Sequence, residues 1–366
     1  MAALRIAFDT GPLHGPRTGI GSAVSELHTT LAARPDVSLV DYLLSFRTPV
    51  PPGTTRLPLP ATVAHRVWAR APMPRVDRWL GEVDVVHGTN YVVPPSRRPC
   101  VVSVYDLWFL RNPSLAAPAV RRAAEVLRAA VGRGAVVHTS SHATETAVRE
   151  LLPGAPVRTV HLGALPVPPS DGDVPIPDLA GRPFIVAIGT VERRKNLPRL
   201  VAAFGHVAAA HRDLVLVLAG SPGDDASATE AAIDALGPAL APRVLRTGRI
   251  DDTARAWLLR HATAVAYPSL DEGFGFPLLD AMQVGVPLVA STAGSIPEVA
   301  GDAARYCDAL DVDSIAAALA SVLDDSAERR RLVDAGNSRW VTFTWQRCAD
   351  GLVDLYRSVS TGELAR

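Results

Sequence analysis

The sequence predicts an α/β protein built from two Rossmann-like domains, each with a parallel sheet. Its 366 residues exceed the length of one ordinary domain. Short apolar runs of strand type alternate with helical patterns in both halves, which is typical of parallel sheets covered by helices on both faces. A proline-rich polar stretch over residues 166–182 lacks periodicity and is typical of a linker between two domains.

Composition and charge exclude several classes of protein. The chain is 48% hydrophobic and 20% charged, with zero net charge, so it can bury large cores and has no global attraction for nucleic acid. Cys100, Cys307 and Cys348 lie far apart, which favours a reducing compartment over a disulfide framework. No secretory leader or long apolar window is visible, so we expect a soluble, cytoplasmic protein.

The first half contains six strand-type runs separated mostly by helical patterns. A loop with glycines at 11, 15, 19 and 21 follows the first run and precedes a helical pattern that starts near Ser22. Such a loop is either a phosphate cradle or a plain tight turn, and its spacing differs from the dinucleotide pattern. The six runs are Leu4–Asp9, Ser38–Leu44, Val83–His87, Cys100–Tyr105, Ala135–Thr139 and Val157–His161.

The second half repeats this architecture after the linker. Ligands bind beyond the carboxyl ends of the strands in open α/β sheets, so we expect the chemistry in a cleft between the two domains. Strands are expected at 184–189, 214–220, 243–247, 264–267 and 287–290, and helices at 198–210, 226–236, 253–261, 312–323, 326–337 and 345–359.

Residues 264–290 combine a strand, an acidic glycine-rich turn and a helix that Pro277 opens. Glu272 lies in the turn, and Asp280 lies one turn into the helix. The amides from Gly273 to Phe276 stand beside the positive end of the helix dipole. Two carboxylates with N–H donors suit a polyhydroxylated, anionic ligand, although an acid near a helix start also serves as a simple cap.

A basic loop, GTVERRKNLPRL, follows the first strand of the second half. Arg194 and Lys195 lie where this loop turns into a helix that Pro198 helps to start. An arginine fork and a lysine at such a position suit a diphosphate. The alternative is an ordinary solvated basic loop.

These two stretches resemble the signatures of family 4 glycosyltransferases, which are retaining enzymes of the GT-B fold. The match runs through PSLDEGFGFPLLDAMQVGVPLVAS, AGSIPEVAGDAA and GTVERRKNL, and RTGIGSAVSEL, HGTNYVVPP, VYDLWFLRNP and TSSHAT follow the same family order. The resemblance implies an acceptor-binding domain over 1–165 with the last helix at about 346–366, a linker over 166–182 and a donor-binding domain over 183–345.

The resemblance also implies a role for each matching residue. Glu272 contacts the donor sugar and stabilises charge at the reacting centre, Arg194 and Lys195 hold the diphosphate, and Asp280 grips the ribose. Asp280 replaces the usual glutamate. The further donor-binding residues are Gly19, Gly21, Thr190, Ile250, Gly273, Phe274, Gly275 and Phe276, and the candidates for the acceptor side or the cleft are Tyr105, Asp106 and His87.

The implied reaction moves a hexose, mannose or glucose, from a nucleotide-diphosphate sugar to a glycan or lipid-linked acceptor in bacterial polysaccharide or glycolipid synthesis. The departing phosphate takes the acceptor proton, and neither a metal nor another cofactor is expected. The string Asp311–Asp313 is interpreted as a helix cap. The alternatives are a sugar-nucleotide epimerase or hydrolase, a non-catalytic sugar-nucleotide-binding module and, more remotely, a dehydrogenase.

Two further patterns allow two interpretations each. Residues 61–81 and 118–133 combine arginines with Trp68 and Trp79, which suits either an anionic membrane surface or solvated helices with tryptophan in the core. Histidines at 87, 138, 142 and 161 fall at predicted strand ends, where each either contacts substrate or is buried and hydrogen-bonded.

Overall fold

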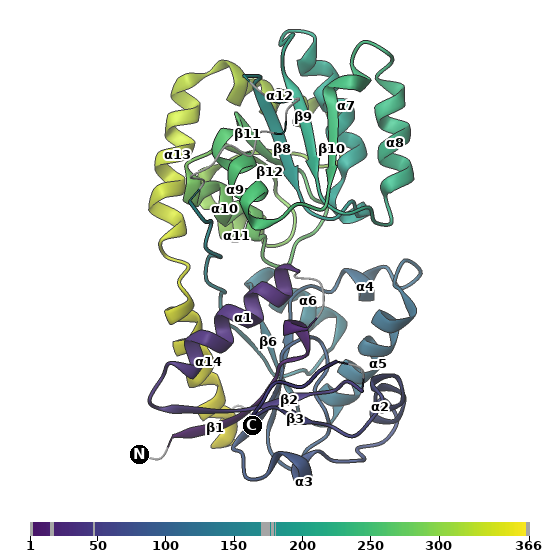
Figure 1. Cartoon of the computed structure of the whole chain (residues 1–366), viewed down its shortest axis with the longest axis vertical. Coiled ribbons are helices and arrows are strands. Elements are labelled where there is room, and N and C mark those ends of the chain that lie inside the picture. Colours follow the sequence, from purple (N-terminus) through teal and green to yellow (C-terminus); the bar gives the residue numbers. More distant parts are fainter. Residues whose placement is uncertain are drawn as a thin grey trace. The chain divides into compact units, whose positions relative to one another are not determined.

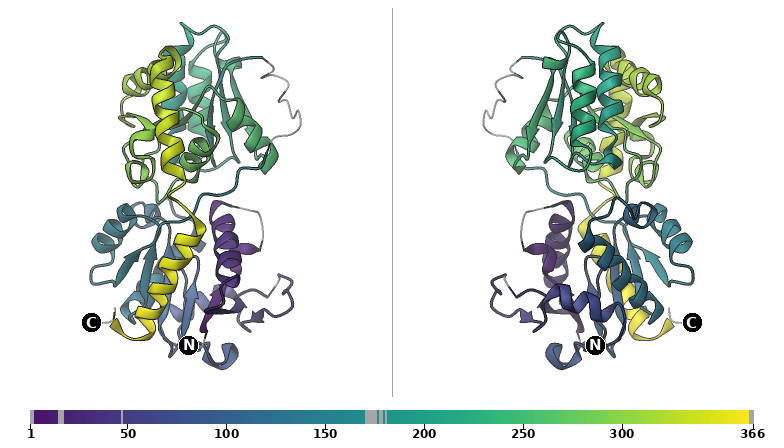
Figure 2. Two further views of the ribbon diagram at one scale, coloured as in Figure 1. Left: turned by 90° about the vertical axis from the view of Figure 1, so that its left-hand side faces the viewer. Right: turned by 90° about the vertical axis from the view of Figure 1, so that its right-hand side faces the viewer.

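The computed structural model describes residues 3–14, 18–46, 48–169, 176, 179 and 181–363. The chain divides into two compact units. Unit 1 comprises Met1–Gly163 and Phe343–Arg366, and unit 2 comprises Ala164–Thr342. Figure 1 labels the elements of both units, and Figure 2 gives two further views. The predicted linker lies partly outside the described residues, at 170–175, 177, 178 and 180.

Unit 1 is built around a seven-stranded parallel sheet, counted over the described residues, in the order β3-β2-β1-β4-β5-β6-β7. All six predicted strands are present, with ends shifted by at most two residues, whereas the two-residue strand β3 was not predicted because it carries no pattern. The strands are β1 (Leu4–Asp9), β2 (Val37–Leu43), β3 (Thr55–Arg56), β4 (Val85–Gly88), β5 (Cys100–Val104), β6 (Val136–Thr139) and β7 (Val157–Thr159). The helices are η1 (Gly11–Leu13), α1 (Gly19–Ala32), α2 (Ala61–Trp68), α3 (Asp77–Leu80), α4 (Trp108–Arg111), α5 (Pro118–Gly132), α6 (His142–Leu151) and α14 (Trp345–Ser360).

The first helix begins earlier than the sequence pattern predicted. The predicted start near Ser22 is wrong, because Thr18 caps the helix by accepting a hydrogen bond from the Gly21 amide at 3.1 Å. A Cβ on Gly21 would lie 2.8 Å from the carbonyl oxygen of Pro12, so only glycine fits this close approach. Gly15 of the predicted loop lies outside the described residues.

Unit 2 contains a six-stranded sheet, counted over the described residues, in the order β10-β9-β8-β11-β12-β13, again with parallel pairing. The predicted strands and long helices are present. Strand β13 was not predicted, since its four residues include an exposed arginine. The strands are β8 (Phe184–Ile188), β9 (Val215–Ala219), β10 (Val244–Gly248), β11 (Ala264–Tyr267), β12 (Leu288–Ser291) and β13 (Ala304–Cys307). The helices are η3 (Arg193–Lys195), α7 (Leu197–Ala208), α8 (Ala226–Ala235), η4 (Ala241–Arg243), α9 (Asp252–His261), α10 (Phe276–Val284), α11 (Ile296–Ala300), η5 (Gly301–Ala303), α12 (Val312–Asp324) and α13 (Ser326–Trp340).

Each sheet has one point where the strand order reverses. In unit 1 the reversal lies between β1 and β4, and in unit 2 it lies between β8 and β11. The loops that leave two such neighbouring strands diverge to opposite faces, which opens a crevice at their carboxyl ends. These two crevices are where the topology alone places ligand sites.

Helix α14 returns to unit 1 and is held there by a buried chain of hydrogen bonds. The Tyr356 hydroxyl lies 2.7 Å from His87 Nδ1, His87 Nε2 lies 2.8 Å from Ser103 Oγ, and Ser103 Oγ lies 2.8 Å from His138 Nδ1. His138 Nε2 lies 3.1 Å from the carbonyl oxygen of Val160. A carbonyl oxygen only accepts, so the direction of every bond in the chain follows: His138 donates to Val160, Ser103 to His138, His87 to Ser103 and Tyr356 to His87.

Trp68 belongs to the core of unit 1. It is fully buried, and its Nε1 donates to the carbonyl oxygen of Pro74 at 3.2 Å. Trp79 is partly buried, with the Arg78 guanidinium 4.1 Å from its ring centroid. The core interpretation is therefore confirmed for Trp68. None of the helices in the described ranges has the length and apolar character needed to cross a bilayer.

Candidate active site

The candidate site of unit 2 forms at the reversal between β8 and β11. Arg194 and Lys195 lie in η3, just after β8, and Glu272 lies in the loop after β11. Because β8 and β11 are adjacent and parallel, their carboxyl ends bring the two loops to one edge of the sheet. The predicted basic loop and the predicted acidic loop therefore meet.

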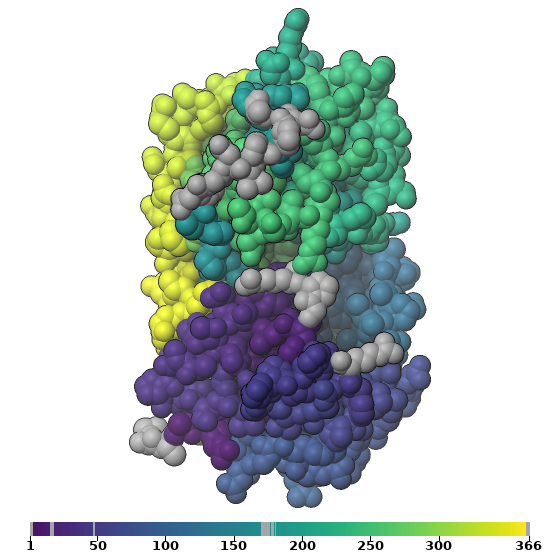
Figure 3. Space-filling view, in the orientation of Figure 1, coloured from purple at the N-terminus to yellow at the C-terminus, as the bar shows by residue number. Residues whose placement is uncertain are grey.

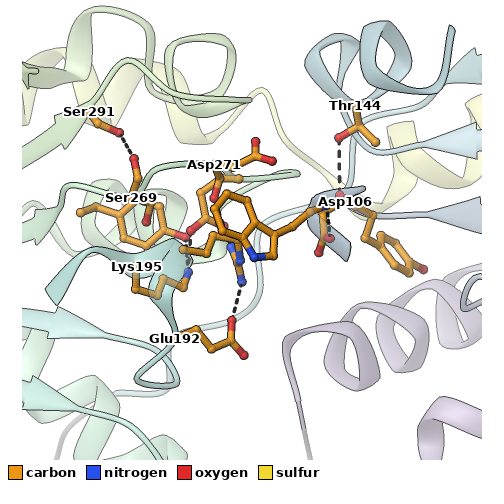
Figure 4. A network of polar contacts seen from close by, with 12 residues as sticks. Asp106, Thr144, Glu192, Lys195, Ser269, Asp271 and Ser291 are labelled. Atoms are coloured by element: carbon orange, nitrogen blue, oxygen red, sulfur yellow. Dashed lines mark hydrogen bonds and ion pairs between the residues drawn. The ribbon is translucent and has the colours of Figure 1, made fainter. Parts of the chain in front are cut away.

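Both oxygens of the Glu272 carboxylate are paired with a cation. The Lys195 ammonium lies 2.6 Å from Oε1, and the Arg194 guanidinium is hydrogen-bonded to Oε2. Arg194 also bonds the Glu192 carboxylate at 3.2 Å, and Lys195 donates to the Tyr267 hydroxyl at 2.9 Å. Figure 4 shows Lys195, Glu192 and the neighbouring Asp271. Four charged side chains thus form one interlocked cluster, with Glu272 only 6% exposed.

Backbone contacts fix the two loops against each other. The amide of Leu270 donates to the carbonyl of Arg194 at 2.7 Å. Asn196, with a φ of 58°, donates through its side chain to the carbonyls of Pro268 and Ala309 at 3.0 Å and 2.7 Å. A left-handed conformation is tolerated by asparagine better than by most residues. The Asn196 side chain therefore holds the basic loop against the start of the acidic loop.

A third loop, between β12 and α11, supports Glu272 from behind. The amide of Ser295 donates to the Glu272 carbonyl at 2.9 Å. Gly294 has a φ of 54°, and a Cβ there would lie 2.4 Å from the same carbonyl oxygen. Position 294 in the AGSIPEVAG segment is therefore a glycine because the backbone of the acidic loop lies where a side chain at that position would be. Figure 4 shows the adjoining bond, in which Ser291 Oγ donates to the carbonyl of Ser269 at 2.6 Å.

The positive charges of Lys195 and Arg194 compensate the negative charge of Glu272 within the cluster. Burial is the largest influence on Glu272 and would raise its pKa, but Lys195 and Arg194 together outweigh it and hold that pKa below its usual range. Burial lowers the pKa of Lys195, although Glu272 opposes this shift. Burial, followed by the Glu272 charge, raises the pKa of Tyr267 well above its ordinary value. Glu272 is therefore a carboxylate at neutral pH.

Helix α10 begins directly after the glycine turn. Gly275 has a φ of 95°, and no side chain caps the helix that starts at Phe276. The predicted opening at Pro277 is correct to within one residue. The rings of Phe274 and Phe276 meet edge to face, with centroids 5.4 Å apart. The positive end of the α10 dipole therefore adjoins the loop that carries Glu272.

Asp280 lies apart from the cluster and has its own cation. Its Oδ2 is hydrogen-bonded to the Arg255 guanidinium from α9, and its Oδ1 is buried without a partner among the described residues. Burial raises the pKa of Asp280 to about 6, although Arg255 opposes the shift. Arg255 also donates to the carbonyl of Pro166 at 3.3 Å. The two acids of the predicted pair are thus held by different arginines.

Two other donor-side candidates lie at strand ends of unit 2. Thr190 is exposed just after β8, and Ile250 is half-buried between β10 and α9. Gly220 lies beside the loop that carries Thr190, where a Cβ would lie 1.9 Å from the carbonyl oxygen of Gly189. This edge of the sheet therefore needs glycine for close packing of two loops.

Within unit 1, the predicted residues fall into three different environments. Gly19 and Gly21 lie in the first turn of α1, where the Gly21 amide is taken by Thr18. Asp106 accepts a hydrogen bond from the Tyr91 hydroxyl at 3.3 Å and one from the Trp108 amide at 3.2 Å.

Two of the predicted unit 1 residues are buried. Tyr105 is 7% exposed, and burial raises the pKa of its hydroxyl. His87 was a candidate for the acceptor side or the cleft. It is instead fully buried in the hydrogen-bonded chain to Tyr356, so it does not line an open site. The buried interpretation holds for His138 as well, whereas His142 is exposed.

The chain is similar to known proteins over nearly its whole length. Residues 176–339 match the family model of group 1 glycosyl transferases. O-antigen chain mannosyltransferase B of Escherichia coli is 27% identical over 97% of this chain and 100% of that protein. Phosphatidyl-myo-inositol mannosyltransferase of Mycolicibacterium smegmatis is 27% identical over 92% of this chain and 86% of that protein.

The chain is a glycosyltransferase, and its residues 176–339 match group 1. A solved sucrose-phosphate synthase from Thermosynechococcus elongatus matches 99% of the chain and all of its own length with a TM-score of 0.75 and 19% identity. The glycosyltransferase therefore has the GT-B fold that the signatures implied. The dehydrogenase alternative is excluded by this assignment.

Sequence reasoning missed three residues of this glycosyltransferase that contact predicted residues within the same unit. Tyr267, Arg255 and Tyr91 each bond a predicted acid or its cation. Tyr267 ends a predicted strand directly before the acidic loop, and that position was a usable signal. Arg255 and Tyr91 reach their partners only through tertiary packing, and no spacing in the sequence predicts these contacts.

Proposed function

We propose that this glycosyltransferase moves a hexose, mannose or glucose, from a nucleotide-diphosphate sugar to a hydroxyl of a glycan or lipid-linked acceptor, with retention at the anomeric carbon. The observation that carries the proposal is the Glu272 carboxylate held between Arg194 and Lys195 at the β8/β11 crevice. The mannosyltransferase relatives support the hexose.

The cluster suits the charges that this reaction develops. The bond from the anomeric carbon to the phosphate oxygen breaks, the acceptor oxygen bonds to that carbon from the same face, and the acceptor proton passes to the departing phosphate. Negative charge then grows on the nucleoside diphosphate, beside Arg194, Lys195 and the α10 N-terminus. Positive charge grows on the sugar, where a carboxylate such as Glu272 stabilises it. No metal is required for this scheme, because fixed cations take up the charge of the leaving group.

Asp280 suits the nucleotide ribose. One of its oxygens is bonded to Arg255, and the other is a buried acceptor that lacks a partner among the described residues. A buried acceptor without a donor costs free energy, so a ligand hydroxyl that supplies one is favoured at this position. A ribose hydroxyl is such a donor.

Calorimetric titration with GDP-mannose, UDP-glucose and ADP-glucose tests the donor. One of the three should bind at least about tenfold tighter than the others, since a polar site discriminates among nucleobases. Incubation with that donor alone separates transfer from epimerisation and hydrolysis, which turn over without acceptor. An α-linked product from an α-linked donor, formed at an unchanged rate in EDTA, supports retention without metal. An inverted product, or a rate abolished by EDTA, contradicts the scheme.

We also propose that unit 1 rests on an anionic membrane surface at the cytoplasmic face, where a lipid-linked acceptor lies. Helix α2 exposes Val63 and Val67 to 46% and 37%, and Arg66 and Arg70 lie exposed between and after them. Apolar and cationic side chains on one helix face suit an anionic lipid surface. Arg66→Glu with Arg70→Glu should abolish co-sedimentation with phosphatidylglycerol vesicles and leave donor binding unchanged. Equal sedimentation of both proteins would contradict the membrane contact.

A further inference from the structure

Unit 1 contains a pocket of about 550 Å³ that none of the proposed donor residues lines. It lies at the carboxyl ends of β1, β2 and β4, at the reversal of strand order, and α2 forms one wall. The opposite wall comes from η1 and the start of α1. Figure 3 shows the N-terminal segments in purple and the segments after β2 in dark blue next to each other on one face of unit 1. A volume of this size lies within the range of pockets that hold small organic ligands.

Two acceptor groups line this pocket. The Asp9 carboxylate is partly exposed and accepts from the Gly11 amide through Oδ1 at 2.9 Å. Asn90 also lines the pocket, and its Oδ1 is buried without a partner in the described part of the chain. Burial raises the pKa of Asp9 to about 6, so this group is mainly a carboxylate at neutral pH. Both groups favour a ligand that donates hydrogen bonds.

The Asp9 carboxylate is held in place by its own loop. A Cβ on Gly11 would lie 3.0 Å from Asp9 Oδ1, so the absence of a side chain there leaves room for the carboxylate. The backbone carbonyl of Asp9 accepts from the Thr89 hydroxyl at 2.8 Å, which ties β1 to the loop after β4. The carboxylate is therefore a preorganised acceptor.

The remaining wall is largely apolar. Val92 and Leu44 line it with partly exposed side chains. His65 of α2 also faces the pocket, with its ring centroid 6.5 Å from that of Trp68. An apolar wall opposite a few fixed acceptors suits a ring with one C–H face and several outward hydroxyls.

We propose that this pocket binds an uncharged or amino-substituted sugar ring of the acceptor and disfavours the phosphorylated and carboxylated counterparts of that ring. The ring hydroxyls or ammonium donate to Asp9 and Asn90, and the C–H face packs on Val92 and Leu44. The negative charge of Asp9 repels a second anion at this short range. The acceptor role rests on the proposed function, whereas the ring binding itself does not.

Titrations of the whole chain with methyl α-mannopyranoside, glucosamine and mannose 6-phosphate, each as a separate probe, test this site. Methyl mannoside and glucosamine should bind, and mannose 6-phosphate should bind at least about tenfold more weakly. Asp9→Asn keeps an acceptor for the Gly11 amide but loses the charge. It should weaken the binding of glucosamine by about tenfold and bring the affinity for mannose 6-phosphate closer to that for methyl mannoside.

Two further variants distinguish the site from a general effect on folding. Ala61→Trp places a large ring in the pocket at the first residue of α2 and should abolish binding of all three probes, with donor affinity unchanged. Glu82→Gln removes a carboxylate from the surface of the same unit, outside the pocket lining, and should change nothing.

The outcomes of these experiments distinguish a wrong pocket assignment from a wrong proposed function. Absence of methyl mannoside binding, equal affinity for the three probes, or unchanged binding in both Asp9→Asn and Ala61→Trp would overturn it. Loss of donor binding or of transfer, with probe binding retained, would instead overturn the proposed function and leave the pocket assignment standing.

Discussion

The ammonium of Lys195 lies 2.6 Å from Oε1 of Glu272, and this ion pair helps to join the two loops that leave β8 and β11. Arg194 occupies the other oxygen of the same carboxylate. Without ligand, the cations that suit a diphosphate are therefore neutralised by the acid that suits the sugar. In the proposed reaction, a donor that binds here shares these cations with Glu272, and the cluster holds them oriented for its diphosphate.

Glu272→Ala tests the central residue of this cluster. We expect the kcat of transfer to fall by about a hundredfold or more, because charge at the sugar loses its carboxylate. We also expect a loss of about 3–5 kcal/mol in unfolding free energy, since two largely buried cations lose their partner. Rates and urea unfolding curves measure the two effects. Near-normal turnover would refute the assigned role. Glu192→Gln, which removes only the more exposed partner of Arg194, should cost far less.

Lys195→Ala tests the diphosphate clamp. We expect both donor affinity and kcat to fall by about tenfold to a hundredfold, because the cation acts on the bound donor and on the leaving group. Calorimetry with the preferred donor and steady-state rates separate the two. Tyr267→Phe is the matched control, since it removes only the hydroxyl that accepts from Lys195. An unchanged rate in Lys195→Ala would reduce the basic loop to a structural element.

Asp280 and Arg255 give a prediction that depends on pH. Burial places the pKa of Asp280 at about 6, above its unfolded value of 3.8. Protonation below about pH 6 removes the carboxylate that accepts from the ribose, so nucleotide affinity should fall as the pH falls through that value. Arg255→Met removes the charge that opposes the shift and should move this fall to higher pH. Titrations with nucleoside diphosphate from pH 5 to 8 measure it, in phosphate-free buffer.

Asp280→Glu is the companion variant, and it should preserve or improve nucleotide affinity because the charge is kept and the reach is longer. A large loss would show that the ribose is held differently. A pH profile in Arg255→Met identical to that of the original chain would show that the pair does not control the affinity.

The sequence predicted the positions of these residues correctly wherever local spacing carries the information. A strand, a glycine turn and a helix start place Glu272 and the α10 N-terminus, and the basic loop falls after the preceding strand of the sheet. Tertiary packing decided the rest. Gly294 is required because the Glu272 backbone lies where its side chain would be, and only the folded loops reveal that contact. The hydrogen bond between Arg255 and Asp280 likewise forms only through tertiary packing.

The burial of His87 has a similar cause. A histidine at the end of a strand lies at the right edge of the sheet for catalysis, but here α14 returns from the far end of the chain and buries it. The contact joins positions 87 and 356, and no local pattern links them. The early start of α1 was missed because Thr18, and not an apolar residue, marks the beginning of that helix.

The chain from Tyr356 to His138 predicts acid-sensitive anchoring of α14. Burial lowers the pKa of His138 to about 4 and that of His87 well below its ordinary value, so the folded state keeps both imidazoles neutral. Unfolded histidine titrates near 6.5, so the unfolded state binds more protons between pH 6.5 and about 4. Stability should therefore be highest above about pH 6.5 and fall as the pH drops to 4, by roughly 3 kcal/mol for each of the two histidines.

Tyr356→Phe tests the same chain at neutral pH. It leaves His87 Nδ1 buried without a donor and should cost about 1–3 kcal/mol in unfolding free energy, with little change in side-chain volume. Urea unfolding, followed by a signal from unit 1, measures this loss. Tyr306→Phe in unit 2 is the control, because its hydroxyl donates to the Gly301 carbonyl at 2.6 Å and touches no histidine. If stability between pH 7 and 4 stays constant, or if Tyr356→Phe costs no more than its control at pH 7, the chain does not anchor the helix.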